Sequence, residues 1–157
     1  MAWHHRVIGR VARAAWRMTK PRTIGVRVLL LDEQDRVALV RHSYTDLWYL
    51  PGGGVKKGES TKAALLRELR EEIAVENAVI DRVLGVYHSR REHKDDHIVI
   101  FVARIASAAG GTLKRADPME IEQAEWFSLD ALPATLSPAT GRRIEEYRAG
   151  RSGAGDW

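Results

Sequence analysis

Three glutamates stand at positions that would share one face of a helix. Glu68, Glu71 and Glu72 follow a glycine-rich stretch, and residues i, i+3 and i+4 of a helix are neighbours on its surface. Carboxylates crowded in this way repel one another, which raises their pKa values unless a cation joins them. Oxygen ligands of this kind suit a hard divalent ion such as Mg²⁺. The pattern therefore predicts a metal site, and the alternative is a solvated charged face.

The residues around these glutamates form a pattern of fixed spacing. It consists of Gly53, Glu59, Arg67, Glu68, Leu69, Glu71, Glu72 and Val75. Residues 53–75 thereby resemble the Nudix box, G-x5-E-x7-R-E-U-x-E-E-x-G-U, in which U is a bulky aliphatic residue. One fixed position departs, because Ala74 stands where the family has a glycine. A Cβ is disfavoured in the left-handed conformation that ends many helices, so we expect either a strained cap at Ala74 or a helix that continues toward Asn77.

The resemblance implies a fold and an activity. The fold is α/β, an α/β/α sandwich around a mixed β-sheet. The activity is hydrolysis of a nucleoside diphosphate linked to a group X, giving a nucleoside monophosphate and phosphorylated X, with Mg²⁺ or Mn²⁺ as cofactor. The proline and tyrosine expected of ADP-ribose and dinucleoside polyphosphate enzymes are missing, which favours a small nucleotide such as a nucleoside triphosphate. The alternatives are a nucleotide-sensing or RNA-binding Nudix-fold protein and an RNA 5′-end pyrophosphohydrolase.

Each carboxylate of the paired set has an expected role. Glu68 and Glu72 are the expected direct metal ligands, and Glu71 is a further ligand or the catalytic base that orients a water molecule. By resemblance to the family, the backbone carbonyl of Gly53 is another candidate ligand of the metal.

Two further features extend the site. Glu59 and Arg67 are expected to form a structural pair that holds the glycine loop to the helix. The segment EIEQAEWFSLDALP also resembles the family's C-terminal half, and family members often recruit a glutamate from such a loop. Glu120, six residues before Trp126, is therefore a candidate catalytic residue, as ligand or base, and the alternative is a solvated loop acid.

Candidate substrate-binding residues flank the box. The aromatic faces of Tyr44 and Trp48 suit stacking on a base, although Trp48 is also a candidate for the core. Gly52 and Gly53 belong to a turn that lets the backbone approach a ligand closely.

Two arginines and the histidines complete the set of candidates. Arg41 and Arg90 are possible partners of the substrate, and Arg90 stands in a loop that is otherwise expected to be solvated. The histidines show no metal-ligand spacing such as H-E-x-x-H and are interpreted as loop or strand residues: His42, His88, His93 and His97.

The elements that must position these residues follow from hydrophobic patterning. Strands are predicted over residues 23–31, 36–41, 48–50, 79–89, 97–105 and 125–127. A helix is predicted over 61–73, with Ser60 as its N-cap, and a second helix over 138–148. Strand pairs combined with two helices indicate a layered α/β domain.

The chain as a whole has the size and composition of one globular domain. Of its 157 residues, 45% are hydrophobic and 29% charged, and the lack of cysteine excludes disulfides and thiolate metal sites. No apolar run approaches the roughly 20 residues that span a bilayer. We expect a cytoplasmic protein that is a monomer or a homodimer.

The net charge of +4 belongs to the N-terminus. Residues 1–31 contain seven basic and no acidic side chains, so the remainder of the chain is mildly acidic. Arg6, Arg10, Arg13 and Arg17 recur at helical spacing, and Pro21 ends the pattern.

This spacing predicts a basic amphipathic arm over residues 1–22. It would bind nucleic acid or an anionic membrane, act as a transit peptide, or dock on the domain or on a second subunit. The Nudix-like domain is expected over residues 23–149, followed by a flexible tail over 150–157 that is rich in glycine, serine and arginine.

Overall fold

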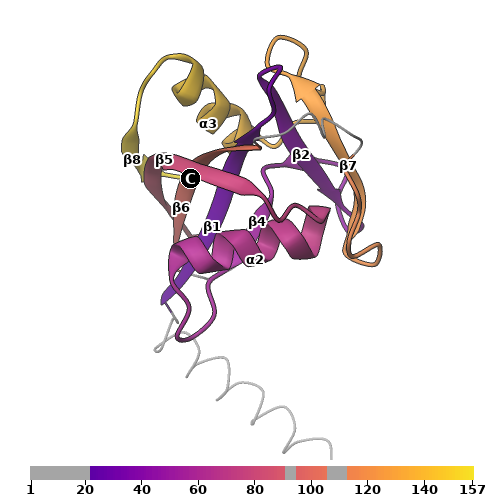
Figure 1. Ribbon diagram of the computed structural model, residues 1–157. Coiled ribbons are helices and arrows are strands. Elements are labelled where there is room, and N and C mark those ends of the chain that lie inside the picture. Colours follow the sequence, from indigo (N-terminus) through magenta and orange to yellow (C-terminus); the bar gives the residue numbers. More distant parts are fainter. Residues whose placement is uncertain (1–21, 91–94, 106–112) are drawn as a thin grey trace, which may run out of the picture.

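The computed structural model describes residues 22–90, 95–105 and 113–157 (Figure 1). The basic arm predicted over residues 1–22 therefore lies outside the described residues, apart from Arg22. None of the described helices is long and apolar enough to cross a membrane.

A mixed β-sheet forms the centre of the molecule. Its strands are β1 (Arg22–Leu31), β2 (Arg36–His42), β3 (Trp48–Tyr49), β4 (Gly52–Gly54), β5 (Ala78–Ser89), β6 (Asp95–Ile105), β7 (Ile121–Ser128) and β8 (Gly153–Asp156). They pair in the order β3-β2-β1-β6-β5-β8, with β4 on β1 and β7 on β2. β1 runs parallel to β6 and β5 runs parallel to β8, whereas the other pairs are antiparallel.

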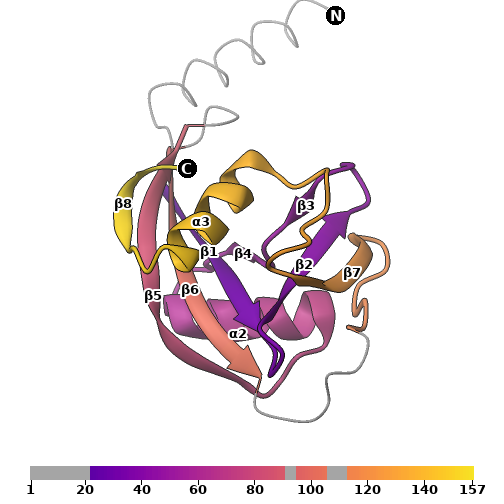
Figure 2. The same ribbon diagram turned by 90° about the horizontal axis from the view of Figure 1, so that it is seen from above.

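Two helices, α2 (Thr61–Ile73) and α3 (Pro138–Arg148), cover opposite faces of this sheet (Figures 1 and 2). Leu69 of α2 belongs to the same buried cluster as Val28 of β1. Ile144 of α3 belongs to a second cluster with Leu29, the next residue of β1. Successive residues of a strand point to opposite faces of the sheet, so one strand supplies both cores. The predicted α/β/α sandwich around a mixed sheet is confirmed.

Both helices have the predicted boundaries, whereas the predicted strands differ from the observed ones by a residue or more, and β6 and β7 extend furthest beyond their predicted ranges. β6 begins at Asp95 rather than at residue 97, and β7 spans Ile121–Ser128 rather than 125–127. β7 pairs with β2 from Arg36↔Ser128 to His42↔Ile121, so its length is set by a partner some 80 residues away in the chain. Such pairing adds polar residues to a strand that local propensity would leave in a loop.

The C-terminal residues differ from the predicted flexible tail. Residues 153–156 form β8, which pairs in parallel with β5 from Gly85↔Gly153 to His88↔Asp156. The backbone N–H of Trp157 donates to the His88 carbonyl at 2.8 Å, and its indole packs against the ring of Tyr87. The tail therefore satisfies the backbone groups of a strand that would otherwise form a sheet edge.

The two ends of α2 show how the sequence delimits this helix. The Ser60 side chain accepts a hydrogen bond from the backbone N–H of Ala63 at 3.1 Å, which confirms the predicted N-cap. At the other end Ala74 has φ 56° and ψ 33°, in the left-handed region, so the helix stops there and does not continue toward Asn77. The residue that replaces the family's glycine thus adopts the conformation that glycine favours.

Candidate active site

The glycine turn of β4 lies directly against α2. Gly52 has φ 141°, and a Cβ there would come within 2.0 Å of the Val26 carbonyl oxygen. At Gly53 a Cβ would come within 2.5 Å of Glu68 Oε1. Gly52 therefore requires glycine, because backbone atoms occupy the space of a side chain, whereas at Gly53 the end of the flexible Glu68 side chain would have to move.

Arg67 joins this turn to the helix. Its Nε and Nη2 donate to the two carboxylate oxygens of Glu59 at 2.8 and 3.0 Å, and Nη2 also donates to the Gly54 carbonyl at 2.9 Å. Its Nη1 reaches Glu68 at 2.7 Å and Glu71 at 2.9 Å. The bidentate hydrogen bond from Arg67 lowers the pKa of Glu59 to about 2, and the same contacts raise the pKa of Arg67. The geometry is that of the predicted structural pair.

Glu72 is the most deeply buried carboxylate of the helix, with 3% of its surface exposed. The backbone N–H of Gly52 donates to its Oε2 at 2.9 Å. Burial raises the pKa of Glu72 to about 8, an effect that Arg27 and the Gly52 N–H oppose and that nearby Glu68 and Glu120 increase. A carboxylate in this state gains from a cation that replaces its proton.

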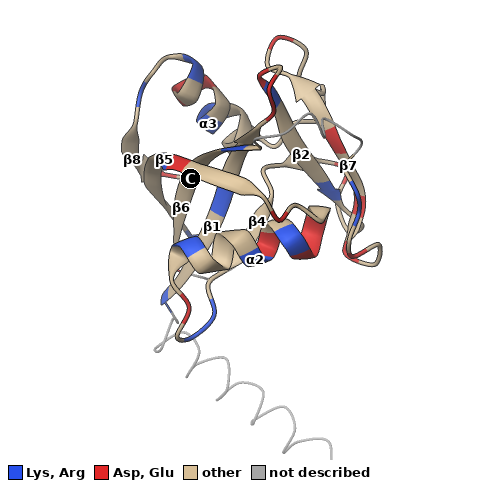
Figure 3. Ribbon diagram, viewed as in Figure 1, with Lys and Arg blue, Asp and Glu red and all other residues tan. Residues whose placement is uncertain are grey.

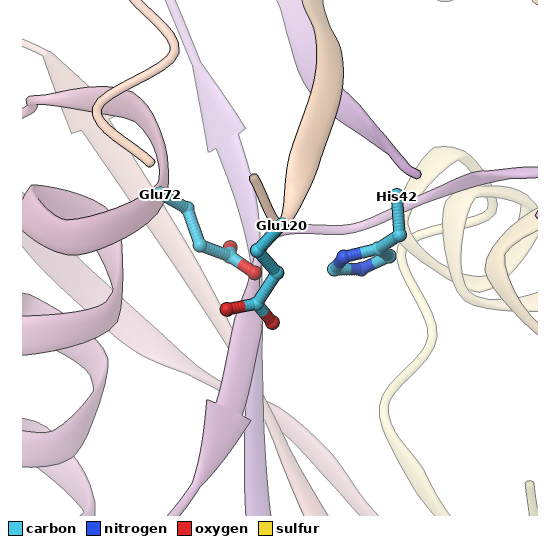
Figure 4. Close-up of side chains that lie close together, drawn as sticks. All are labelled: His42, Glu72 and Glu120. Atoms are coloured by element: carbon cyan, nitrogen blue, oxygen red, sulfur yellow. The ribbon is translucent and has the colours of Figure 1, made fainter. Parts of the chain in front are cut away.

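Glu120 approaches Glu72 from the other side of the site, where β7 begins. One ligand atom each of His42, Glu72 and Glu120 lies within 4.8 Å of the other two (Figure 4). A hydrogen bond beside the β2–β7 pairing holds this arrangement, because the Ser43 backbone N–H donates to the Glu120 carbonyl at 2.9 Å. The acidic residues of α2 lie in its C-terminal half (Figure 3), and Glu72 among them belongs to this cluster.

Arg27 is a site residue that sequence reasoning missed. From β1 its Nη1 donates to the carbonyl oxygens of Leu50 and Gly52 at 3.1 and 2.9 Å, which fixes the turn from a third element. Its charge also acts on Glu72 and on His42. The available signal was its place in TIGVRVLLL, where it is the sole charged residue of an apolar run.

His42 is the second missed residue, since the sequence offered no spacing typical of a ligand. Its side chain is 4% exposed, and its Nδ1 is buried without a hydrogen-bond partner among the described residues. Its ring stacks on Tyr44 with centroids 5.1 Å apart and planes at 14°. Burial, followed by the charge of Arg27, lowers the pKa of His42 to about 4, so the imidazole is neutral at physiological pH.

The predicted substrate-binding residues fall into different environments. Tyr44 is 76% exposed, with one face on His42. Trp48 is buried against Phe127 with ring centroids 4.9 Å apart, so the core alternative describes it and stacking on a base does not. Arg41 contacts Glu122 at 3.4 Å and lies over the Trp48 ring.

Arg90 is exposed at the end of β5, away from the cluster around Glu72. It borders a cavity of about 470 Å³ lined by His88, Ser89, Arg90, Asp156 and Trp157. The structure thus brings together the box glutamates, the glycine turn and Glu120, and it leaves Trp48 and Arg90 outside this group.

The side chains present fit a divalent cation. They supply carboxylate oxygens from two elements, one carboxyl whose pKa burial has raised, and one buried imidazole nitrogen without a partner. Glu72 and Glu120 lie in one cluster with His42, and Glu68, whose Oε1 contacts Arg67, and Glu71, at the exposed edge, are further candidate ligands.

Comparisons with known proteins assign the chain to a family. The family model of the NUDIX domain matches residues 21–147. The chain is 33% identical over 128 residues to a putative 8-oxo-dGTP diphosphatase of Bacillus subtilis, covering 82% of this chain and 81% of that protein. It is 32% identical over 144 residues to the NAD-capped RNA hydrolase NudC of Pseudomonas aeruginosa, covering 87% of this chain and 48% of NudC, about half its length.

A solved structure shows the same architecture. The MutT protein from Methanosarcina mazei Go1 superimposes with a TM-score of 0.69 at 26% identity, covering 83% of this chain and 96% of that one.

Proposed function

This chain belongs to the Nudix hydrolase family and acts on pyrophosphate bonds, and from that premise we propose that it cleaves a nucleoside triphosphate to the monophosphate and pyrophosphate. The proposed cofactor is Mg²⁺ or Mn²⁺. The observation that carries the proposal is the buried Glu72 carboxylate, oriented by the Gly52 N–H and adjoined by Glu120.

The roles of the side chains follow from their positions. Glu68 and Glu72 would hold the cation, with Glu120 and the Gly53 carbonyl as further candidates. When bound, such a cation neutralises phosphate oxygens and lowers the pKa of a water molecule. Glu71 is the candidate base, because 51% of its side chain is exposed and, within the described residues, its ion-pair partner is Arg67.

The remainder of the site is preorganised by the chain itself. Arg27 and Arg67 fix the two sides of the glycine turn through its carbonyl oxygens. No reorganisation of the backbone is then needed when charge develops on the phosphate, which is the condition for strong electrostatic stabilisation.

The exposed ring of Tyr44 supports a small nucleotide as the substrate. Tyr44 exposes one ring face while the other rests on His42, so a base can extend a stack that already exists. The similarity to a putative 8-oxo-dGTP diphosphatase supports a purine nucleoside triphosphate.

An RNA 5′ end is the second candidate. It is supported by the similarity to an NAD-capped RNA hydrolase and by the seven basic residues within positions 1–31. Deletion of residues 1–20 should then weaken turnover of RNA and spare free nucleotides. Equal loss on both substrates would contradict a role of the arm in binding RNA.

The test is a substrate panel in which the products are separated and identified by chromatography, since ADP-ribose and NAD-capped RNA are cleaved without release of phosphate or pyrophosphate. It contains the nucleoside triphosphates, 8-oxo-dGTP, ADP-ribose and capped RNA, each with Mg²⁺ or Mn²⁺. Glu72→Gln should abolish turnover, and Glu76→Gln, an exposed position just after α2, should not. Pyrophosphate release from a triphosphate supports the proposal. Binding of nucleotides without turnover of any compound would instead indicate a sensor.

A further inference from the structure

The imidazole of His42 lies in the carboxylate cluster although no part of the box motif supplies it. Figure 4 shows its ring pointing toward the space into which the side chains of Glu72 and Glu120 extend. We propose that His42 is a nitrogen ligand of a divalent cation held together with Glu72 and Glu120, and that this nitrogen makes the site prefer Mn²⁺ to Mg²⁺. The inference rests on the metal dependence included in the proposed function and goes beyond it in ligand set and ion.

The distances suit an ion. Ligand atoms that each lie about 2.2 Å from a cation are about 3 to 4.4 Å from one another in octahedral geometry. The three ligand atoms of the cluster already lie within 4.8 Å of one another. Three ligands of one octahedral ion include at least two cis pairs about 3 Å apart, and rotation about side-chain torsions is what would bring the ligand atoms to these separations.

The state of His42 is unusual for a core histidine. Buried polar atoms nearly always have a hydrogen-bond partner, and leaving one without a partner is costly. Nδ1 of His42 has none among the described residues, although 96% of the side chain is buried, given its exposed fraction of 4%. A bound ion would provide the missing interaction for this ring.

Backbone contacts and strand register place the three residues before any ion binds. Glu72 is oriented through Oε2 by the Gly52 N–H, which leaves Oε1 free of that bond. The β2–β7 register is irregular between Arg41 and His42, a bulge of the kind that re-aims a side chain. The carbonyl of Glu120 is fixed by the Ser43 N–H next to that bulge.

The choice of ion follows from the ligand types. Mg²⁺ demands oxygen ligands and keeps much of its water, whereas imidazole nitrogen suits first-row transition metals. A site of carboxylates alone would accept Mg²⁺ readily. With one nitrogen among these three protein ligands, Mn²⁺ gains a bond that Mg²⁺ does not form well. The site therefore binds Mn²⁺ more tightly than Mg²⁺.

Pulsed electron paramagnetic resonance of the Mn²⁺-loaded full chain tests the assignment directly. A ligating imidazole produces ¹⁴N modulation of the Mn²⁺ echo. We expect this modulation in the wild type and in His97→Gln, an exposed histidine of β6, and its loss in His42→Gln. Titration of free Mn²⁺ should show an affinity lower by about tenfold or more in His42→Gln, with little change for Mg²⁺.

Each result decides the question. Absence of ¹⁴N modulation in the wild type overturns the inference without any variant, so the experiment does not depend on the folding of His42→Gln. Mn²⁺ bound only through oxygen leaves the proposed hydrolase intact, whereas no binding of Mn²⁺ or Mg²⁺ removes both. Loss of the modulation in His97→Gln as well would also contradict a specific role of His42.

Discussion

The molecule holds two arginine-centred clusters, one on each helix, and they differ in charge balance. On α2, Arg67 is shared by Glu59, Glu68 and Glu71, and Glu72 lies close by with a pKa that burial raises.

On α3, the buried Arg143 has a single carboxylate partner, Glu146, at 3.0 Å. Its guanidinium also lies 3.6 Å from the centre of the Tyr87 ring and 5.7 Å from that of Trp157. In the second cluster one guanidinium faces one carboxylate, although Arg143 Nε is buried without a hydrogen-bond partner among the described residues. In the first cluster three carboxylates share one guanidinium. We infer from this difference that the α2 cluster is the one suited to a cation.

The largest difference in kcat should appear when one carboxylate near each arginine is replaced by the corresponding amide. Glu72→Gln should lower kcat by about 10²–10³-fold, because it removes a charged group from the site where phosphate charge develops. Glu146→Gln should leave kcat near that of the wild type. Steady-state kinetics on the identified substrate makes the comparison, and similar losses in both variants would remove the distinction between the clusters.

The next effect concerns stability. Arg143→Ala should destabilise the fold by about 3 kcal/mol, because the Glu146 carboxylate and the Tyr87 ring lose a buried partner. Its neighbour Arg142 is exposed, so Arg142→Ala serves as the matched control and should change stability little. Urea unfolding with metal absent provides the two free energies. A drop in kcat at wild-type stability would argue that α3 takes part in the chemistry.

A third effect is the pH dependence of the metal-free protein. The pKa of Glu72 is raised to about 8 in the fold, so the folded state binds a proton that the unfolded chain releases above its usual value near 4.5. Stability should therefore fall as the pH rises through 8. His42 has the opposite effect, because its pKa is lowered from 6.5 to about 4, so it makes stability rise with pH. This rise falls mainly between these two pKa values and fades above pH 6.5.

Between pH 6.5 and 8 the loss should be on the order of 2 kcal/mol. Saturating Mn²⁺ should abolish this loss of stability, and the Glu72→Gln variant should not show it. Thermal melts at matched ionic strength measure this. A wild-type profile identical to that of Glu72→Gln would mean that this carboxyl is not protonated in the fold.

The smallest effect lies at the end of the helix that carries the site. Ala74→Gly should stabilise the protein by about 0.5–1 kcal/mol, since Ala74 has φ 56°. Ala63→Gly, at an exposed position of the same helix, should destabilise it by a similar amount. Differential scanning calorimetry resolves shifts of opposite sign, and two shifts of the same sign would contradict the assignment of strain to Ala74.

The parts of the site that depend on neighbours in sequence could be predicted. The boundaries of α2, its N-cap at Ser60 and the contact between Glu59 and Arg67 follow from helical periodicity and from a motif that spans 23 residues. Interactions of this kind are decided within a few turns of chain, where backbone geometry leaves few options.

The parts that the sequence missed or left open depend on strand register. His42 and Glu120 are 78 positions apart and meet because β2 pairs with β7. Trp48 suited either a base or the core until Phe127 from the same β7 covered it. The glycine-rich composition of residues 153–156 predicted a frayed end. These residues form a strand because β5 offers an edge with which they pair.

The sequence by itself therefore determined the family, the helix of glutamates and the glycine turn that faces it, because these need only local geometry. Tertiary structure alone decided that Glu72 is buried, that Arg27 holds the turn and that an imidazole joins the carboxylates. Burial and electrostatic environment depend on which strands become neighbours, and that choice is made by the packing of the whole sheet between its two helices.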